Sequence, residues 1–136
     1  MSRPYDTLAW QAVDWQRPFT VEEVWEMLSH LATLKRRSPI IWEARGRNGQ
    51  IRYQIGAYSQ SIGSITDAIR AHGDIRTHAI PGPSRKKVDI VQTIKVSHPV
   101  LSLNTSVTMS AIRAALAAMS AMHGEEETVV QVILGR

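Results

Sequence analysis

The sequence predicts an α+β fold, in which a mostly antiparallel sheet carries helices on one face. Short runs with strand-like alternation are interleaved with segments of helical periodicity. Two of the strand-like runs flank Asn48-Gly49, a dipeptide that favours a two-residue hairpin turn. No linker long enough to separate two domains interrupts the 136 residues. We therefore expect one α+β domain over 1–136, with the ferredoxin-like order β-α-β-β-α-β followed by β-α-β.

The first strand is predicted over residues 8–15, and the first helix runs from the Thr20 cap to near Lys35-Arg36-Arg37. Residues 8–15 are apolar in both alternating sets, which is typical of a strand buried on both faces. A helix follows, because Thr20 is placed to cap its first turn and Glu23 completes a capping box. Apolar residues at helical spacing predict its buried face: Val21, Val24, Trp25, Leu28, Leu31 and Ala32. The basic segment Lys35-Arg36-Arg37 is expected to end the helix, since cations stabilise its negative end.

A hairpin at Asn48-Gly49 has a register that follows from the turn itself. A type I′ turn there makes apolar residues face each other, as Trp42 opposite Ile55 and Ala44 opposite Tyr53. The other side of the hairpin then carries polar pairs, as Glu43 opposite Gln54 and Arg45 opposite Arg52. A slip of one residue would turn these charges toward the core, so the register is strongly specified.

The remaining elements are predicted from shorter patterns. Ser61 starts a short helix that buries Ile62, Ile65 and Ile69, and Gly73 is placed to stop it with a positive φ. Residues 74–80 read as a strand, which Pro81-Gly82-Pro83-Ser84 terminates. A long, half-exposed strand is expected over 88–96, after Arg85-Lys86-Lys87.

The C-terminal part is expected to hold a third helix and a last strand. Asn104-Thr105 is placed to cap the helix, which ends at His123-Gly124. Its apolar stripe is Ile112, Ala115, Leu116, Met119 and Met122. Residues 129–134 are apolar on both faces apart from Gln131, which predicts a strand inside the sheet.

Composition excludes several classes of protein. The chain has no cysteine, which rules out disulfides and thiolate zinc sites and fits a reducing compartment. Its longest apolar runs are far shorter than the ~20 residues that a membrane-spanning helix needs. The first residues lack the apolar core of a signal peptide. We therefore expect a cytoplasmic location and no membrane span.

No catalytic motif is present, so we predict no catalytic residue, cofactor site or metal site in this segment. The sequence has no G-x-x-x-x-G-K-[ST], G-x-G-x-x-G, G-x-S-x-G or H-E-x-x-H pattern. The five histidines are scattered and are interpreted as surface or helix-end residues. Glu43 has two interpretations, an acid in a groove or a solvent-facing residue beside Arg45 or Arg52, and the second is favoured. The hairpin register assigns Trp42 and Tyr53 to core packing rather than to stacking on bases.

The net charge of +4 favours binding to a polyanionic partner. Basic residues are found on the hairpin and before the predicted strand at 88–96. Both groups are at or near strand ends, where loops can lie side by side along one edge of the sheet. The predicted contact residues for nucleic acid or a partner are Arg45, Arg47, Arg52, Arg85, Lys86 and Lys87.

Three segments together resemble the N-terminal module of conjugative type IV secretion coupling ATPases, which are FtsK/HerA-related motor proteins. They are Trp15-Gln16-Arg17-Pro18-Phe19, the stretch 41–56 with Ile41-Trp42-Glu43-Ala44-Arg45 and Asn48-Gly49, and the stretch 129–135. The resemblance implies a non-catalytic assembly or substrate-docking domain in DNA transfer between cells. It implies partners among the secretion or transfer machinery, DNA, or further copies of the parent ATPase.

The resemblance also implies that ATP hydrolysis belongs to chain beyond Arg136, because no Walker A or Walker B site lies in these residues. A chain that ends directly after what looks like a central strand is expected to be the N-terminal module of a longer protein, and a complete small protein could also end so. Two other functions stay open. A free-standing basic nucleic-acid-binding protein would show salt-dependent DNA affinity. A small enzyme with Glu43 or a histidine in a cleft would show a pocket of perturbed titrating groups.

Overall fold

The computed structural model describes residues 8–34, 38–82, 90–93 and 108–135. Within these ranges the element order is β1 (Leu8–Trp15), α1 (Val21–Thr33), β2 (Ile40–Arg47), β3 (Gln50–Tyr58), α2 (Ser59–Arg70), β4 (Ile75–Ile80), α3 (Thr108–Ser120) and β5 (Glu127–Leu134). The fold is α+β, as predicted, and the first six elements follow the predicted β-α-β-β-α-β order.

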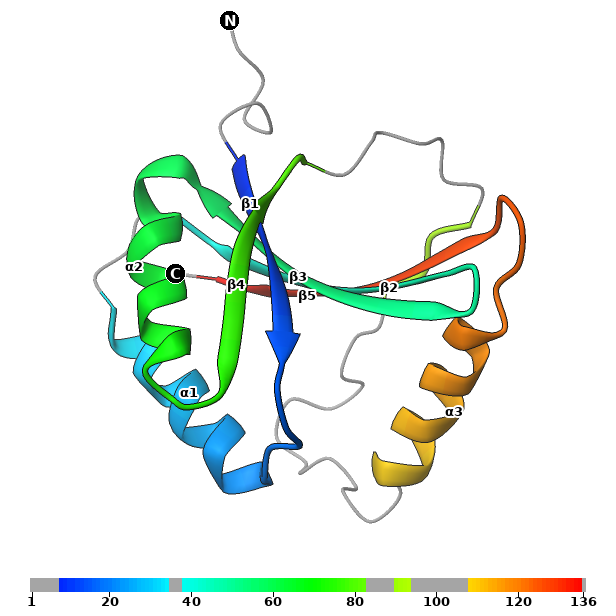
Figure 1. The fold of residues 1–136 in the computed structure, drawn as a ribbon, viewed down its shortest axis with the longest axis horizontal. Helices are drawn as coiled ribbons and strands as arrows, with labels where there is room; N and C mark the ends of the chain where they lie inside the picture. Colours follow the sequence, from blue (N-terminus) through cyan, green and yellow to red (C-terminus); the bar gives the residue numbers. More distant parts are fainter. Residues whose placement is uncertain (1–7, 35–37, 83–89, 94–107, 136) are drawn as a thin grey trace, which may run out of the picture.

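The five strands form one sheet in the order β4-β1-β3-β2-β5, and every neighbouring pair is antiparallel (Figure 1). β5 pairs with β2 along its whole length and lies at the edge of the sheet. The prediction of an internal strand at 129–134 is therefore wrong for the described residues. That prediction assumed that a strand apolar on both faces has neighbours on both sides, but β5 has one neighbour among the described strands and keeps its branched side chains exposed.

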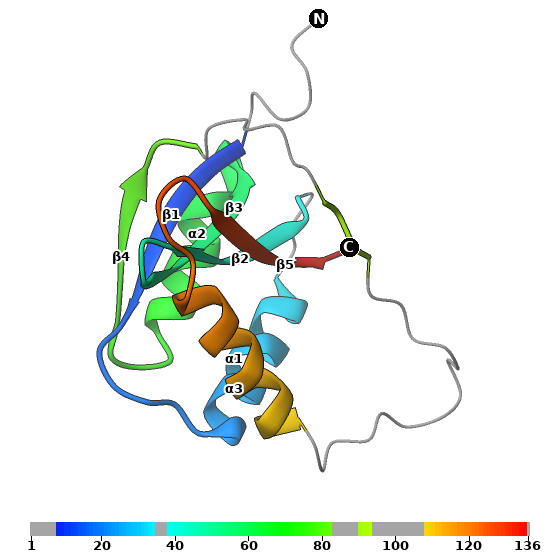
Figure 2. The same cartoon turned by 90° about the vertical axis from the view of Figure 1, so that its right-hand side faces the viewer.

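The helices lie on one side of the sheet, as Figures 1 and 2 both show. Side chains alternate along a strand, so Val13, Ile40 and Ile55 point to the side where α1 and α2 pack. We call this side the helix face. The core between the helix face and the two helices includes Leu31, Ile65 and other apolar residues. The opposite side, called the open face, carries Trp10, Glu43 and Gln54 and is not covered by any of the three helices.

α3 packs against the turn end of the β2–β3 hairpin, and a glycine allows the close approach. A Cβ built at Gly46 would lie 2.4 Å from the carbonyl oxygen of Met119, so a side chain at Gly46 would push α3 away. Gly46 belongs to the same alternating set as Ile40, which places α3 on the helix face with the other two helices. Of the predicted stripe, Met119 is buried at this contact, whereas Ala115 is exposed.

The hairpin confirms the predicted register in full. Asn48 has φ 50° and Gly49 has φ 72°, as a type I′ turn demands. The predicted pairs all occur: Trp42 with Ile55, Ala44 with Tyr53, Glu43 with Gln54, and Arg45 with Arg52. Trp42 and Tyr53 pack against the core, and Trp15 lies beside both with ring centroids 6.3 and 6.4 Å away. Their assignment to the core is confirmed.

α1 begins as predicted, but its buried face matches the predicted one only in part, since Leu31 is buried as expected and Met27 was not predicted. The Thr20 side chain accepts a hydrogen bond from the Glu23 amide, and the Glu23 side chain accepts one from the Thr20 amide. The buried residues are Met27 and Leu31, whereas Val21 and Trp25 of the predicted face are 78% and 71% exposed. Apolar residues run around more of this helix than one contact can cover. The packing of α1 against α2 selects the Met27 side, which periodicity alone did not identify.

The other predicted elements can be compared only in part. α2 buries Ile62, Ile65 and Ile69, and Gly73 has φ 129°, both as expected. Of the strand predicted at 88–96, residues 90–93 are described and are in neither a strand nor a helix. β-branched residues favour strands only where a neighbour pairs with them. The predicted cap at Asn104-Thr105 and the basic segments 35–37 and 85–87 lie outside the described residues.

Candidate functional site

A buried carboxylate is the centre of a polar cluster on the open face. Glu43 is 5% exposed, and its two carboxylate oxygens accept three hydrogen bonds, one from its own strand and one from each neighbouring strand. Gln54 Nε2 and Arg45 Nε donate to Oε2 at 2.7 and 2.9 Å, and Gln131 Nε2 donates to Oε1 at 2.7 Å. Glu43 is thus neither a solvent-facing residue nor an acid open to a groove. Its neighbour is Arg45, as one interpretation held, but it is held inside a structural network across β3, β2 and β5.

Two of the three hairpin arginines are paired with acids. Arg45 contacts Glu43 and, through Nη1, Glu127 Oε1 at 2.9 Å. Burial lowers the pKa of Arg45, but the hydrogen bonds to Glu43 and Glu127 outweigh this and raise the pKa overall. Arg47 Nη2 lies 3.9 Å from Glu125 Oε2. The predicted basic surface is therefore largely neutralised within the described residues.

Arg52 differs from the other two, because no acid of the described chain lies within ion-pair distance of it. It is exposed on β3 and lines an open groove of about 860 Å³ together with residues of β1 and β4. The groove is bounded by Ala12, Val13, Asp14, Trp15, Ile51, Arg52, Tyr53, Gln54, His78, Ile80 and Pro81. His78 Nδ1 lies 3.4 Å from Asp14 Oδ2 there. Arg85, Lys86 and Lys87 lie outside the described residues, so the structure brings together only the hairpin part of the predicted contact set.

Two histidines form a pair that sequence analysis missed. His30 Nδ1 of α1 lies 2.9 Å from His72 Nε2, which follows α2, and the two rings are half-buried. At that distance one ring nitrogen donates its proton to the other. The two residues are 42 positions apart, so no local spacing could indicate the contact. Within the described ranges, no group of three His, Cys, Asp or Glu residues is placed to hold a metal ion.

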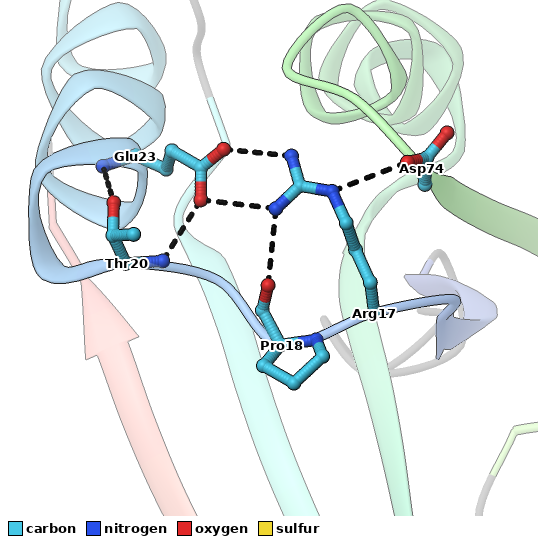
Figure 3. Close-up of polar contacts among 5 residues, drawn as sticks. All are labelled: Arg17, Pro18, Thr20, Glu23 and Asp74. Carbon is cyan, nitrogen blue, oxygen red and sulfur yellow. Dashed lines mark hydrogen bonds and ion pairs between the residues drawn. The ribbon is translucent and has the colours of Figure 1, made fainter.

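Arg17 joins three parts of the chain at the start of α1 (Figure 3). It donates to both carboxylate oxygens of Glu23 at 2.7 and 3.2 Å, to Asp74 Oδ2 at 3.2 Å and to the Pro18 carbonyl at 3.0 Å. The hydrogen bond from Arg17, followed by that from the Thr20 backbone, lowers the pKa of Glu23 from 4.5 to about 2. The same bond to Glu23 raises the pKa of Arg17. This cluster fixes the β1–α1 connection to the loop before β4, which is a structural role.

The outer edge of β5 is the most apolar exposed surface of the described sheet. Val129 and Ile133 are 39% and 59% exposed on the open face, and Val130 and Val132 are 47% and 53% exposed on the helix face. No described strand pairs with this edge. The opposite edge, β4, carries Arg76 and His78 and ends at Pro81, features that block pairing with another strand. β5 has none of these protections between Thr128 and Leu134.

Comparisons with protein-family models, with curated proteins and with solved structures returned no match. Among the helices of the described chain, none has both the length and the apolar character needed to cross a bilayer.

Proposed function

We propose that this chain is a non-catalytic binding domain that works in the assembly of a larger protein complex or in docking a protein substrate. The observation that carries the proposal is the β5 edge, where four branched apolar side chains are exposed on a strand whose outer side pairs with no strand of the described residues. An exposed edge of this kind is a template on which another strand adds.

The charge arrangement supports protein binding over DNA binding. Nonspecific DNA affinity grows with the number of cations that reach phosphates. Arg45 and Arg47 already contact Glu43, Glu127 and Glu125, so a phosphate would have to compete with those carboxylates. Arg52 is the hairpin arginine that stays available, and one cation supplies little affinity.

The resemblance to conjugative coupling ATPases adds a more specific hypothesis. In that setting the binding domain would serve a cytoplasmic DNA-transfer machine, with the motor in other parts of the protein and with secretion proteins or further ATPase copies as partners. No comparison with known proteins bears on this hypothesis. The free-standing nucleic-acid-binding protein is the competing proposal, and Arg52 in its groove is the observation that favours it.

A salt titration of single-stranded DNA binding separates the two functions. If all six predicted basic residues neutralised phosphates, the log-log slope of affinity against salt would be near −4, at about −0.7 per contact. We expect instead binding weaker than a Kd of about 10⁻⁴ M at physiological salt, the weak end of nonspecific binding. Fluorescence anisotropy with a labelled oligonucleotide measures both quantities.

Two variants identify the source of any affinity. One changes Arg52 to Ser, and the other changes Arg85, Lys86 and Lys87 to Ser. Arg113→Ser on α3 is the matched control, because Arg113 is exposed and lies away from the hairpin groove. Tight binding with a steep slope that flattens in the first two variants but not in the control would refute the assembly proposal.

A further inference from the structure

We propose that the β5 edge pairs with the β5 edge of a second copy of this chain, which joins two five-stranded sheets into one. This inference rests on the proposed binding function and names its partner. A second copy is proposed as the partner because the sequence of β5 is complementary to itself when two copies are aligned antiparallel. An antiparallel neighbour across a two-fold axis keeps each side chain on its own face of the sheet, so each position must pair with one of the same alternating set.

One register satisfies both faces. With Gln131 on the two-fold axis, Val129 faces Ile133 of the second copy on the open face, and Val130 faces Val132 on the helix face. Every exposed branched residue of β5 then meets another branched residue. Such directly opposed pairs are the unit by which sheets gain stability. A register centred on Val130 would instead place Val129 against Gln131 and Glu127 against Ile133, which leaves polar groups against apolar ones.

The polar cluster of the open face continues across the same axis. Gln54, Glu43 and Gln131 form a row over β3, β2 and β5, linked by hydrogen bonds of 2.7 Å. In the Gln131-centred register this row meets its own copy side by side. Two glutamine side chains would lie next to each other at the axis, an arrangement in which amides stack and hydrogen-bond well.

Charge does not oppose the pairing. The single charged residue of β5 is Glu127 at its start, and its carboxylate is held by Arg45 of its own chain. In the proposed register Glu127 faces Gly135 of the second copy, far from the second Glu127. Growth beyond two copies is limited, because the other edge of each sheet is β4 with its charged side chains and Pro81.

Sedimentation equilibrium of the chain over a range of concentrations tests the pairing. We expect a monomer–dimer equilibrium. Val132→Lys should weaken association by about tenfold or more, because a charge replaces an apolar partner of Val130 on each side of the two-fold axis. Val132 is exposed in the single chain, so the fold should survive, which circular dichroism checks. Ala79→Lys, at an exposed position of the β4 edge, is the matched control and should leave the dimer intact.

Cysteine cross-linking tests the register, since the natural chain offers no thiol to interfere. Gln131→Cys should form a disulfide-linked dimer readily, because directly opposed residues have Cα atoms about 4.5–5.5 Å apart, within disulfide range. Ile133→Cys lies on the same face, but its two copies would be roughly 14 Å apart along the strands, at 3.4 Å per residue. This variant should not cross-link.

The outcomes separate the inference from the function on which it rests. A chain that stays monomeric at all concentrations overturns the pairing. This holds whether hydrogen exchange finds the β5 backbone amides exposed to solvent or protected by another part of the same chain. A dimer that Val132→Lys leaves unchanged also overturns it, because another surface must then be responsible. A monomer that shows only weak DNA binding refutes the pairing alone, whereas steep salt-dependent DNA binding refutes the proposed function.

Discussion

Glu43 is the acceptor that holds the polar cluster of the open face together. Glu43→Ala would leave the donors of Gln54 and Gln131 without their acceptor and would deprive Arg45 of one of its two acids. We expect the free energy of unfolding to fall by about 3 kcal/mol, the usual effect of removing one partner from a buried charged network. Urea denaturation measures the change.

Glu26→Ala is the control for this substitution, because Glu26 is an exposed residue of α1. Its removal should change the free energy of unfolding by less than about 0.5 kcal/mol. Equal effects of the two substitutions would show that the cluster around Glu43 contributes nothing of its own.

Glu23 should make stability depend on pH in the acid range. Its pKa is lowered from 4.5 to about 2 in the folded protein, chiefly by the Arg17 hydrogen bond. A pKa that is lower in the folded state gives stability that is fully present above pH 4.5 and is lost as the pH falls toward 2. In Glu23→Gln the free energy of unfolding should vary less with pH across that window.

The control for the pH experiment is Glu26→Gln on the same helix. It should reproduce the wild-type slope between pH 4.5 and 2, since Glu26 is exposed and Glu23 is untouched. An identical slope in wild type and Glu23→Gln would mean that the Arg17–Glu23 pair does not form in solution. Ionic strength should be held constant, because salt screens exposed pairs.

At the scale of the element, the hairpin turn depends on Gly49. Its φ of 72° is strained for a β-branched residue, so Gly49→Val should lower the free energy of unfolding by about 1 kcal/mol or more. The melting temperature should fall by about 3–5 °C for a chain of this size. Differential scanning calorimetry measures it, and an unchanged melting temperature would contradict the turn type.

Gly63 provides the opposite case for comparison. It lies inside α2, and a Cβ built there has nothing within 4 Å. Gly63→Ala should therefore stabilise the protein by roughly 0.5–1 kcal/mol through helix propensity alone. Two glycine substitutions of opposite sign would show that backbone conformation, and not the loss of glycine itself, sets the effect.

Structural features that depend on residues close together in the sequence could be predicted. The turn at Asn48-Gly49 fixed every pair of the hairpin, and Thr20 with Glu23 fixed the start of α1. The buried face of α1 could be predicted only in part, as at Leu31, because apolar residues surround much of the helix and its contact with α2 decides which are covered. The prediction that β5 lies inside the sheet failed for a related reason, since the residue pattern of a strand does not reveal on which side a neighbouring strand is missing.

At the scale of the whole molecule, long-range contacts account for what the sequence did not reveal. The pairing of Arg45 with Glu127 and of His30 with His72 joins residues 82 and 42 positions apart. Of the predicted contact set, Arg45, Arg47 and Arg52 lie on the hairpin as expected, but Glu127 and Glu125, which pair with Arg45 and Arg47, come from the C-terminal part. Counting charges along a chain cannot show which of them are paired in space.

The union of β2 with β5 also has a consequence for the order in which the protein folds. The two hairpin strands are joined by a turn of two residues, whereas the contact between Glu43 and Gln131 joins residues 88 positions apart. Bringing distant segments together costs more chain entropy before any contact compensates for it, so β5 should dock after the hairpin has formed. Until then the apolar edge of β2 is uncovered, and a chain caught at that stage is the one most prone to aggregate.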